Sequence, residues 1–191
     1  KLNEIDLKDF FSKYNLGKLV SYKGIEEGIE NTNYLIKTSK GKFILTIYEK
    51  RVQENDLPFF IGLMKNLFNA NFKSPEPIIN KNGSYISEIL NKKAAVVSFL
   101  EGNSKKNLSP ENCFSVGVET AKLHMITKEL SIKRENRLSV ESWKKIYDKV
   151  SKDCSKIHTN LPKIIEKNLD EIEKNWPKNI PSGIIHADLF P

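Results

Sequence analysis

Residues 18–49 have the sequence KLVSYKGIEEGIENTNYLIKTSKGKFILTIYE, which contains three runs typical of β-strands. The runs are residues 18–25, 33–38 and 42–49, and each contains β-branched or aromatic side chains. Ser39, Lys40 and Gly41 separate the last two runs and predict a tight hairpin. The polar connection between the first two runs is longer than a plain hairpin needs. The stretch therefore predicts a sheet that begins with consecutive antiparallel strands.

Two helices are predicted on either side of this stretch. Residues 4–16 predict a short helix whose apolar face contains Ile5, Phe10 and Phe11. Residues 56–70 predict a longer one, because Asp56 can cap it and Pro58 is tolerated in a first turn. Its apolar stripe, at helical spacing, consists of Leu57, Phe60, Ile61, Met64 and Phe68.

Further strands complete the first half of the chain. Residues 77–79 and 84–89 predict a second hairpin around the turn residues 81–83. Residues 94–100 form a continuous apolar run of the length expected for a buried strand. The pattern predicts an α+β protein whose first lobe is a five-stranded, mainly antiparallel sheet with one helix inserted after the third strand.

The second half of the chain has the pattern of helices. Ser109, Pro110 and Glu111 are a strong helix start, and further helices are predicted from about Ser139 and after Asn160. The apolar face of the first of these helices consists of Phe114, Val118, Ala121 and Met125. Residues 183–188 predict a short strand that runs into a loop. The boundary between the two halves is predicted at residues 101–108.

Composition narrows the classes of partner. The chain has 39% hydrophobic and 29% charged residues and a net charge of +7, which favours a folded protein without a membrane span. Only three of the 31 basic residues are Arg, and the basic residues are scattered, which argues against a nucleic-acid partner. Cys113 and Cys154 lack metal-ligand spacing and are interpreted as reduced thiols of a cytoplasmic protein. No feature of the sequence specifies an oligomeric state.

One candidate site lies between the first two predicted strands, where Gly24, Gly28, Asn31 and Asn33 follow one another. Glycines let backbone amides approach a polyphosphate without an intervening Cβ. A glycine-bearing connection is usually only a turn, so these residues taken alone favour a turn over a phosphate site. Neither a Walker loop nor a dinucleotide fingerprint is present, since no helix follows the loop.

Two further segments, each of three residues, are candidates for catalysis and for adenine binding. His186, Ala187 and Asp188 form a His-x-Asp triplet. In kinases the aspartate of such a triplet accepts the proton of the attacking hydroxyl and the histidine holds the loop in shape, although the triplet by itself is common by chance. The second segment is the join after the last strand, with the following candidate residues: Ser98, Phe99 and Leu100. Their backbone groups could bind adenine, although a buried strand that ends in a turn explains the same residues.

Together these segments resemble the aminoglycoside phosphotransferase-like kinases, which share a bilobal protein-kinase-like fold. The stretches that carry the resemblance are SYKGIEEGIENTNYLI (21–36), FILTIYEKR (43–51), DLPFFIGLM (56–64), AAVVSFLEGN (94–103), ETAKLHM (119–125), NRLSVESW (136–143) and NWPKNIPSGIIHADLF (175–190). The combination of EGIENTNY with LTIYEKR is similar to the bacterial homoserine kinases of that fold. The resemblance implies a nucleotide-binding lobe with hinge at residues 1–103. It implies that residues 104–191 are the first part of a helical lobe, ending in the catalytic loop.

The resemblance also implies an activity, which is ATP- and Mg²⁺-dependent phosphorylation of the L-homoserine hydroxyl, a step of threonine biosynthesis. Asp188 would be the catalytic base, the segment from Gly24 to Asn33 the loop over the phosphates, and residues 98–102 the adenine hinge. Alternatives are a kinase of another amino alcohol, a sugar or an aminoglycoside, and a non-catalytic nucleotide-binding protein. The residues alone do not identify the acceptor.

The sequence departs from the family pattern at two places. Thr46 stands where a phosphate-binding lysine is usual. Either Lys50 or Arg51 supplies that charge, with Glu54 a candidate partner, or the family does without it. The family's magnesium ligands follow the catalytic aspartate, so we expect them after Pro191 and none within the chain. On this interpretation the chain is truncated just after its catalytic aspartate.

Overall fold

The computed structural model describes residues 2–26, 31–49, 53–103, 105 and 107–189. Its contacts divide the chain into two compact units. The first unit comprises residues 1–132 and 183–191, and the second comprises residues 133–182.

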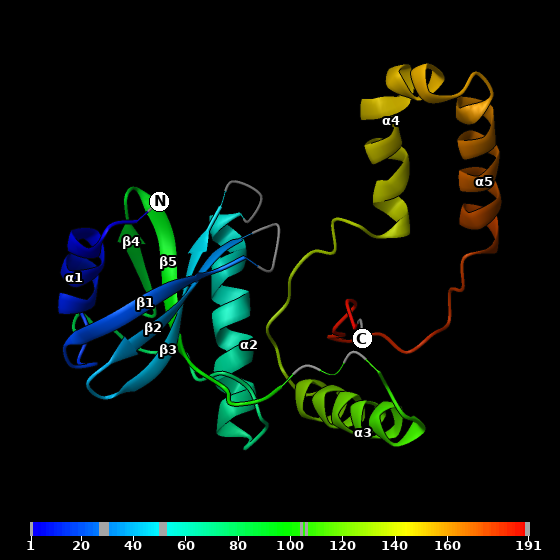
Figure 1. Ribbon diagram of the computed structural model, residues 1–191. Helices are drawn as coiled ribbons and strands as arrows, with labels where there is room; N and C mark the ends of the chain where they lie inside the picture. Colours follow the sequence, from blue (N-terminus) through cyan, green and yellow to red (C-terminus); the bar gives the residue numbers. More distant parts are fainter. Residues whose placement is uncertain (1, 27–30, 50–52, 104, 106, 190–191) are drawn as a thin grey trace. The chain divides into compact units, whose positions relative to one another are not determined.

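The first unit is built on a five-stranded sheet with strand order β1-β2-β3-β5-β4 (Figure 1). The strands are β1 (Leu19–Ile25), β2 (Asn31–Thr38), β3 (Gly41–Tyr48), β4 (Ile86–Ile89) and β5 (Lys92–Ser98). All neighbouring pairs are antiparallel. The predicted sheet is therefore confirmed, including the tight β2–β3 turn at Ser39 and Lys40.

The register of the sheet separates two sets of side chains. Leu45 of β3 lies opposite Tyr34 of β2 and Val96 of β5. The next residue, Thr46, lies opposite Asn33 and Ala95. Because successive strand residues point to opposite faces, the first set lies on one face and the second on the other.

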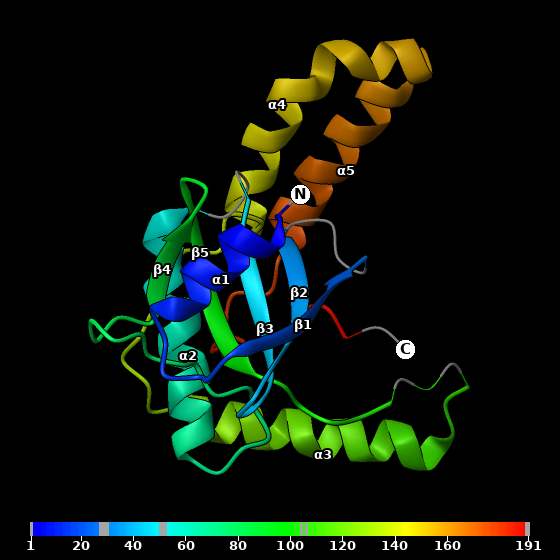
Figure 2. The same ribbon diagram turned by 60° about the vertical axis from the view of Figure 1, so that its left-hand side comes forward.

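Helix α1 (Glu4–Ser12) covers the first face (Figure 2). Asn3 and Asp6 form a capping box at its start, which satisfies two backbone N–H groups. The buried side chains of the helix and of the residues after it join those of the strands in one core: Leu7, Phe10, Phe11, Tyr14, Tyr34, Ile36, Phe43, Leu45, Ile47, Ile89, Ala94 and Val96. The predicted helix is confirmed but ends at Ser12. Ile5 is wrong as a face residue, since it is 78% exposed and Leu7 takes its place.

Helix α2 (Leu57–Asn69) lies on the other side of the sheet from α1 (Figures 1 and 2). It follows a short 3₁₀ turn, η1 (Glu54–Asp56), and has Pro58 in its first turn. Asp56 stands at the N-cap position, but its side chain makes no capping hydrogen bond. Leu67 is buried, whereas the predicted stripe residue Phe68 is 41% exposed. The helix is confirmed, and its buried stripe is rotated by one residue at its end.

The second hairpin differs from the predicted one. β4 pairs with β5, and Leu90 and Asn91 join them with φ angles of 47° and 60°. Two consecutive residues in the left-handed conformation match the right-handed twist of a hairpin. Leucine is uncommon in that conformation, so the sequence does not predict a turn at Leu90. In the predicted first arm, Pro77 makes only an isolated bridge to Val97. The predicted pairing of residues 77–79 with 84–89 is therefore wrong.

Helix α3 (Pro110–Thr127) completes the helices of the first unit. Ser109 caps it and forms a capping box with Asn112, as the start signal predicts. Phe114 and Met125 of the predicted apolar face are 75% and 71% exposed among the described residues. The change from strands to helices falls between β5 and α3, where the sequence places its boundary. The lobe boundary remains a prediction, because the two compact units divide after residue 132 and not between β5 and α3.

The second unit is a helical hairpin of α4 (Val140–Ile157) and α5 (Leu161–Asn175). Trp143 packs edge-on against Trp176 with ring centroids 5.3 Å apart, and its indole N–H donates to the carbonyl of Leu138 at 2.7 Å. Both predicted helix starts are confirmed. None of the described helices combines the length and apolar character that a membrane crossing requires.

Candidate functional site

The glycine-bearing connection joins β1 to β2. Gly24 lies in β1 opposite Tyr34, and a Cβ added there would lie 3.9 Å from the tyrosine ring, which is an ordinary contact. Packing among the described residues therefore does not require glycine at this position, and a side chain there would lie on the α1 face, beside the core residue Tyr34. Gly28 lies outside the described residues.

Two asparagines at the start of β2 share the sheet face opposite α1. Asn31 lies across from Tyr48, and Asn33 lies across from Thr46. The Oδ1 atom of Asn31 is buried and has no hydrogen-bond partner in the described part of the chain. A buried acceptor without a donor is costly, so this oxygen favours a donor that the described residues do not supply.

Thr46 and Asn33 are joined by a side-chain hydrogen bond. The Thr46 hydroxyl donates to Asn33 Oδ1 at 2.9 Å, and both residues are half-buried. With the carbonyl oxygen of its amide engaged, Asn33 keeps the two N–H donors of that amide for another partner. The hairpin register predicts this pair, because a two-residue turn after Thr38 places residue 33 opposite residue 46. Sequence reasoning considered Thr46 only as a missing lysine and overlooked the bond.

The charges expected near Thr46 are arranged differently from the family pattern. The Glu54 carboxylate lies 3.8 Å from the Lys93 ammonium of β5, which also pairs with Glu88. The hydrogen bond to Glu88 is the largest cause of a raised pKa of Lys93, and the same bond lowers the pKa of Glu88. The other candidates, Lys50 and Arg51, lie outside the described residues. Glu54 thus pairs with a β5 lysine.

The predicted hinge begins where β5 ends. The backbone N–H of Ser98 donates to the Glu76 carbonyl at 2.9 Å, and Ser98 Oγ accepts from the Glu76 N–H at 2.8 Å. The Phe99 N–H donates to the Lys42 carbonyl at 3.3 Å. Two of the three predicted hinge residues therefore use their N–H groups inside the protein. Leu100 is 47% exposed, and its N–H is the first after β5 without a hydrogen bond to the described residues.

A lysine on the neighbouring strand braces this join. The Lys42 ammonium lies 2.7 Å from Glu101 Oε1 and 5.3 Å from the centre of the Phe99 ring. The ion pair is exposed, so its contribution to stability is small. The pair links β3 to the segment after β5, and no sequence motif predicts this contact.

The His-x-Asp segment forms a tight local loop. The Asp188 N–H donates to His186 Nδ1 at 3.3 Å, and Ala187 between them has a φ of 62°. A non-glycine residue in the left-handed region is uncommon and favours a loop held in a defined shape. The Asp188 side chain is exposed. The predicted strand at residues 183–188 is wrong: no described strand pairs with this segment, and an extended segment needs a partner to become a strand.

Metal ligands were expected only after Pro191. Within the described ranges, no group of three or more His, Cys, Asp or Glu residues is placed to hold a metal ion. The described donors therefore do not form a magnesium site.

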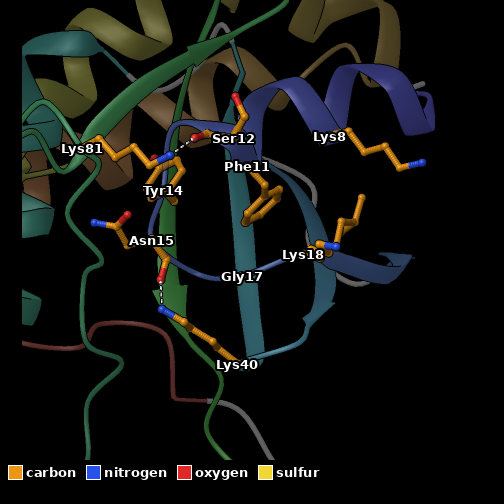
Figure 3. Close-up of a pocket in the computed structure, with 10 residues that line it drawn as sticks. Lys8, Phe11, Ser12, Tyr14, Asn15, Gly17, Lys18, Lys40 and Lys81 are labelled. Atoms are coloured by element: carbon orange, nitrogen blue, oxygen red, sulfur yellow. Dashed lines mark hydrogen bonds between the residues drawn. The ribbon is translucent and has the colours of Figure 1, made fainter.

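One pocket lies on the α1 side of the sheet, between α1, the start of β1 and the β2–β3 turn (Figure 3). The Lys40 ammonium donates to the Asn15 carbonyl at 2.9 Å, and the Lys81 ammonium donates to the Ser12 carbonyl at 2.6 Å. These bonds fasten the segment after α1 to the β2–β3 turn and to the loop before β4. The pocket adjoins the end of β1 away from Gly24, so it is separate from the predicted site.

Comparisons with known proteins agree with this architecture. The sequence profile of the phosphotransferase enzyme family matches residues 21–191. The chain is 42% identical over 190 residues to the homoserine kinase of Brucella anthropi, covering 100% of this chain and 58% of that protein. It is 41% identical over 186 residues to the homoserine kinase of Nitrobacter hamburgensis, covering 97% and 57% of the two chains. The chain thus spans somewhat more than half the length of these relatives.

Two solved structures share the fold. Spectinomycin phosphotransferase, solved in complex with ADP and spectinomycin, matches with a TM-score of 0.64 and 12% identity over 98% of this chain and 63% of that one. A microcompartment-associated aminopropanol kinase matches with a TM-score of 0.58 and 13% identity over 74% and 48% of the two chains. At these identities the likeness concerns the fold alone. The family profile covers most of the chain, and the chain therefore belongs to the phosphotransferase enzyme family.

Proposed function

We propose that the protein containing this chain transfers the γ-phosphoryl group of ATP to the side-chain hydroxyl of L-homoserine, a step of threonine biosynthesis in the cytoplasm. The observation that carries the proposal is the 42% identity to a homoserine kinase over the whole of this chain. Membership of a phosphotransferase family supports the reaction type. The identity with homoserine kinases supports the choice of acceptor over an aminoglycoside or another amino alcohol.

Asp188 is the proposed catalytic base. The homoserine hydroxyl oxygen attacks the γ-phosphorus in line, its proton passes to the Asp188 carboxylate, and ADP leaves as the bond to the bridging oxygen breaks. The products are O-phosphohomoserine and ADP. The hydrogen bond from the Asp188 N–H to His186 Nδ1 supports a positioning role for the histidine.

The nucleotide is proposed to lie under the sheet face that carries Asn33 and Thr46. The backbone of the segment from Gly24 to Gly28 would approach the phosphates, and Asn31 and Asn33 would contribute side-chain groups at the start of β2. The exposed join after β5 would receive the adenine. Since Ser98 and Phe99 use their N–H groups internally, Leu100 is the proposed donor, with the other two residues contributing shape.

An acceptor panel tests this proposal in the full-length gene product. ADP release is measured with L-homoserine, L-serine, L-threonine, 1-aminopropan-2-ol and spectinomycin, and the phosphorylated product is identified by ³¹P NMR. We expect kcat/KM for homoserine to exceed that for the other acceptors by about 100-fold or more, because sites that pair buried polar groups with a substrate reject analogues strongly. Preference for another acceptor would replace homoserine in the proposal. ATP binding without phosphorylation of any acceptor would favour the non-catalytic alternative.

A further inference from the structure

The sheet face opposite α1 carries lysines as well as the Asn33–Thr46 pair. Lys23 of β1 lies opposite Leu35, while Lys37 of β2 lies opposite Lys42 of β3. Residues 33, 35 and 37 alternate with the core residues Tyr34 and Ile36, so their cross-strand partners share the outer face. The ring of Tyr22 packs 6.5 Å from that of Tyr34, which places Tyr22 on the α1 side and its neighbour Lys23 on the outer face.

Most of the cations on this face already have partners or lie at its far end. Lys42 pairs with Glu101, and Lys93 of β5 lies between Glu54 and Glu88. Lys37 adjoins the β2–β3 turn, four residues along β2 from Asn33, or about 13 Å away. Within the described part of the chain, the exposed Lys23 ammonium has neither a hydrogen bond nor an ion pair.

Lys23 is also close to the polar pair. Ile25 lies directly opposite Asn33, so Lys23, two residues earlier on the same face, is its diagonal neighbour. Diagonal neighbours in an antiparallel pair are about 7–8 Å apart, which long side chains can span. The Lys23 ammonium and the Asn33 amide can therefore reach the same ligand group, directly beside Gly24.

Resting on the proposed function, we propose that Lys23 supplies the positive charge that holds the ATP phosphates on this face. Thr46 is neutral and acts as a positioning residue, because its hydroxyl fixes the amide of Asn33. A triphosphate bound here meets one flexible cation from β1 and two amide N–H donors from β2. The phosphate-binding charge thus comes from the strand that precedes the glycine connection, and β3 contributes only a hydroxyl.

The test compares the binding of ATP and of adenosine by calorimetry in the full-length gene product. Lys23→Gln is expected to raise the Kd for ATP about tenfold, because it removes a hydrogen bond to a charged group. The Kd for adenosine is expected to stay within about twofold, since adenosine has no phosphate. Lys23→Arg keeps the charge and is expected to restore most of the ATP affinity. Lys37→Gln is the matched control, because it removes an exposed lysine from the same face and leaves both affinities unchanged.

Several results would overturn the inference. One is an unchanged Kd for ATP in Lys23→Gln, above all if Lys50→Gln, Arg51→Gln or Lys93→Gln shows the loss instead. Another is an equal loss of adenosine and ATP affinity, which would indicate a structural effect. If wild-type protein binds no ATP, the proposed function itself fails, and the inference fails with it.

Discussion

The two faces of the sheet differ although the same strands build both. On the α1 face, Ile36 and Leu45 have no exposed surface and pack against aromatic side chains of the helix. On the outer face, Asn33 and Thr46 are half-buried and bonded to each other. Residues one position apart along β3 therefore belong to different environments. The comparison separates a packed core face from the face on which the proposed ligand would bind.

Asp188→Asn is expected to have the largest effect on the functional side of this comparison. The variant keeps the size of the side chain but removes the proposed proton acceptor, so turnover should fall about 10²–10⁴-fold with ATP affinity little changed. Steady-state kinetics and ATP titration of the full-length gene product measure both quantities. Asp170→Asn, at an exposed position of α5, is the matched control and should be silent. Near wild-type turnover in Asp188→Asn would show that the base lies elsewhere.

Leu45→Ala should lower the stability of the protein, in contrast to Asp188→Asn, which should lower turnover. The Leu45 side chain is fully buried between the sheet and α1, and removing it should lower the free energy of unfolding by about 2–5 kcal/mol through lost burial and a cavity. Urea unfolding measures the change. Ile5→Ala on α1, where the side chain is 78% exposed, should change it by less than about 0.5 kcal/mol. Equal losses from the two variants would contradict the assignment of the core to this face.

Much of the sheet could be predicted because local signals and tertiary structure agree there. The runs at residues 18–25, 33–38 and 42–49 have strand composition, and Gly41 after a polar turn fixes the β2–β3 register. The second hairpin could not be predicted, because its turn uses Leu90 and Asn91 at positive φ instead of glycine. Residues 77–79 do run beside β5, since Pro77 bridges Val97 and the Ile78 N–H donates to the Val96 carbonyl at 2.8 Å, but this pairing is too short to form a strand.

In the candidate site, too, some features could be predicted from the sequence and others could not. Asp188 and Gly24 could be selected as candidates by motif, because their proposed roles depend on residue type and spacing. The interactions of Thr46, Lys42 and Lys93 could not be read from motifs, since their partners come from other strands or from the ends of neighbouring segments. Cross-strand register carries that information, and only a reliable hairpin turn makes it available from sequence.

Thr46→Val tests whether the hydroxyl on the outer face serves ligand binding more than folding. Valine keeps the shape of threonine but removes the hydrogen bond to the Asn33 amide. Because this amide is then no longer fixed in orientation, KM for ATP should rise about three- to tenfold. The free energy of unfolding should change by less than about 1.5 kcal/mol, the net value of one hydrogen bond. Thr46→Ser retains the hydroxyl and should behave like wild type. A larger loss of stability with unchanged KM would place Thr46 among the structural residues.

Tyr14→Phe is expected to have the smallest effect, and it tests a polar cluster on the α1 face. The Tyr14 hydroxyl donates to Ser87 Oγ at 2.8 Å, and Asn80 Nδ2 donates to the same oxygen at 2.9 Å. Phenylalanine removes one bond and leaves Ser87 with its other partner, so the loss at pH 7 should be about 1 kcal/mol. The KM for ATP should not change, because the cluster lies on the face opposite the Asn33–Thr46 pair.

The pH dependence of Tyr14→Phe provides the sharper measurement. Burial raises the pKa of Tyr14, and the bond to Ser87 opposes this only in part. A phenol whose pKa is raised on folding contributes its stability below its unfolded pKa of about 10 and loses it as the pH rises through the folded pKa. Wild-type protein should therefore lose more stability than Tyr14→Phe between about pH 9 and 11, so the two unfolding curves converge. Burial also raises the pKa of Tyr48, but that contribution is common to both proteins and cancels in the difference. Parallel curves across this range would show that Tyr14 is not held as a neutral phenol in the core.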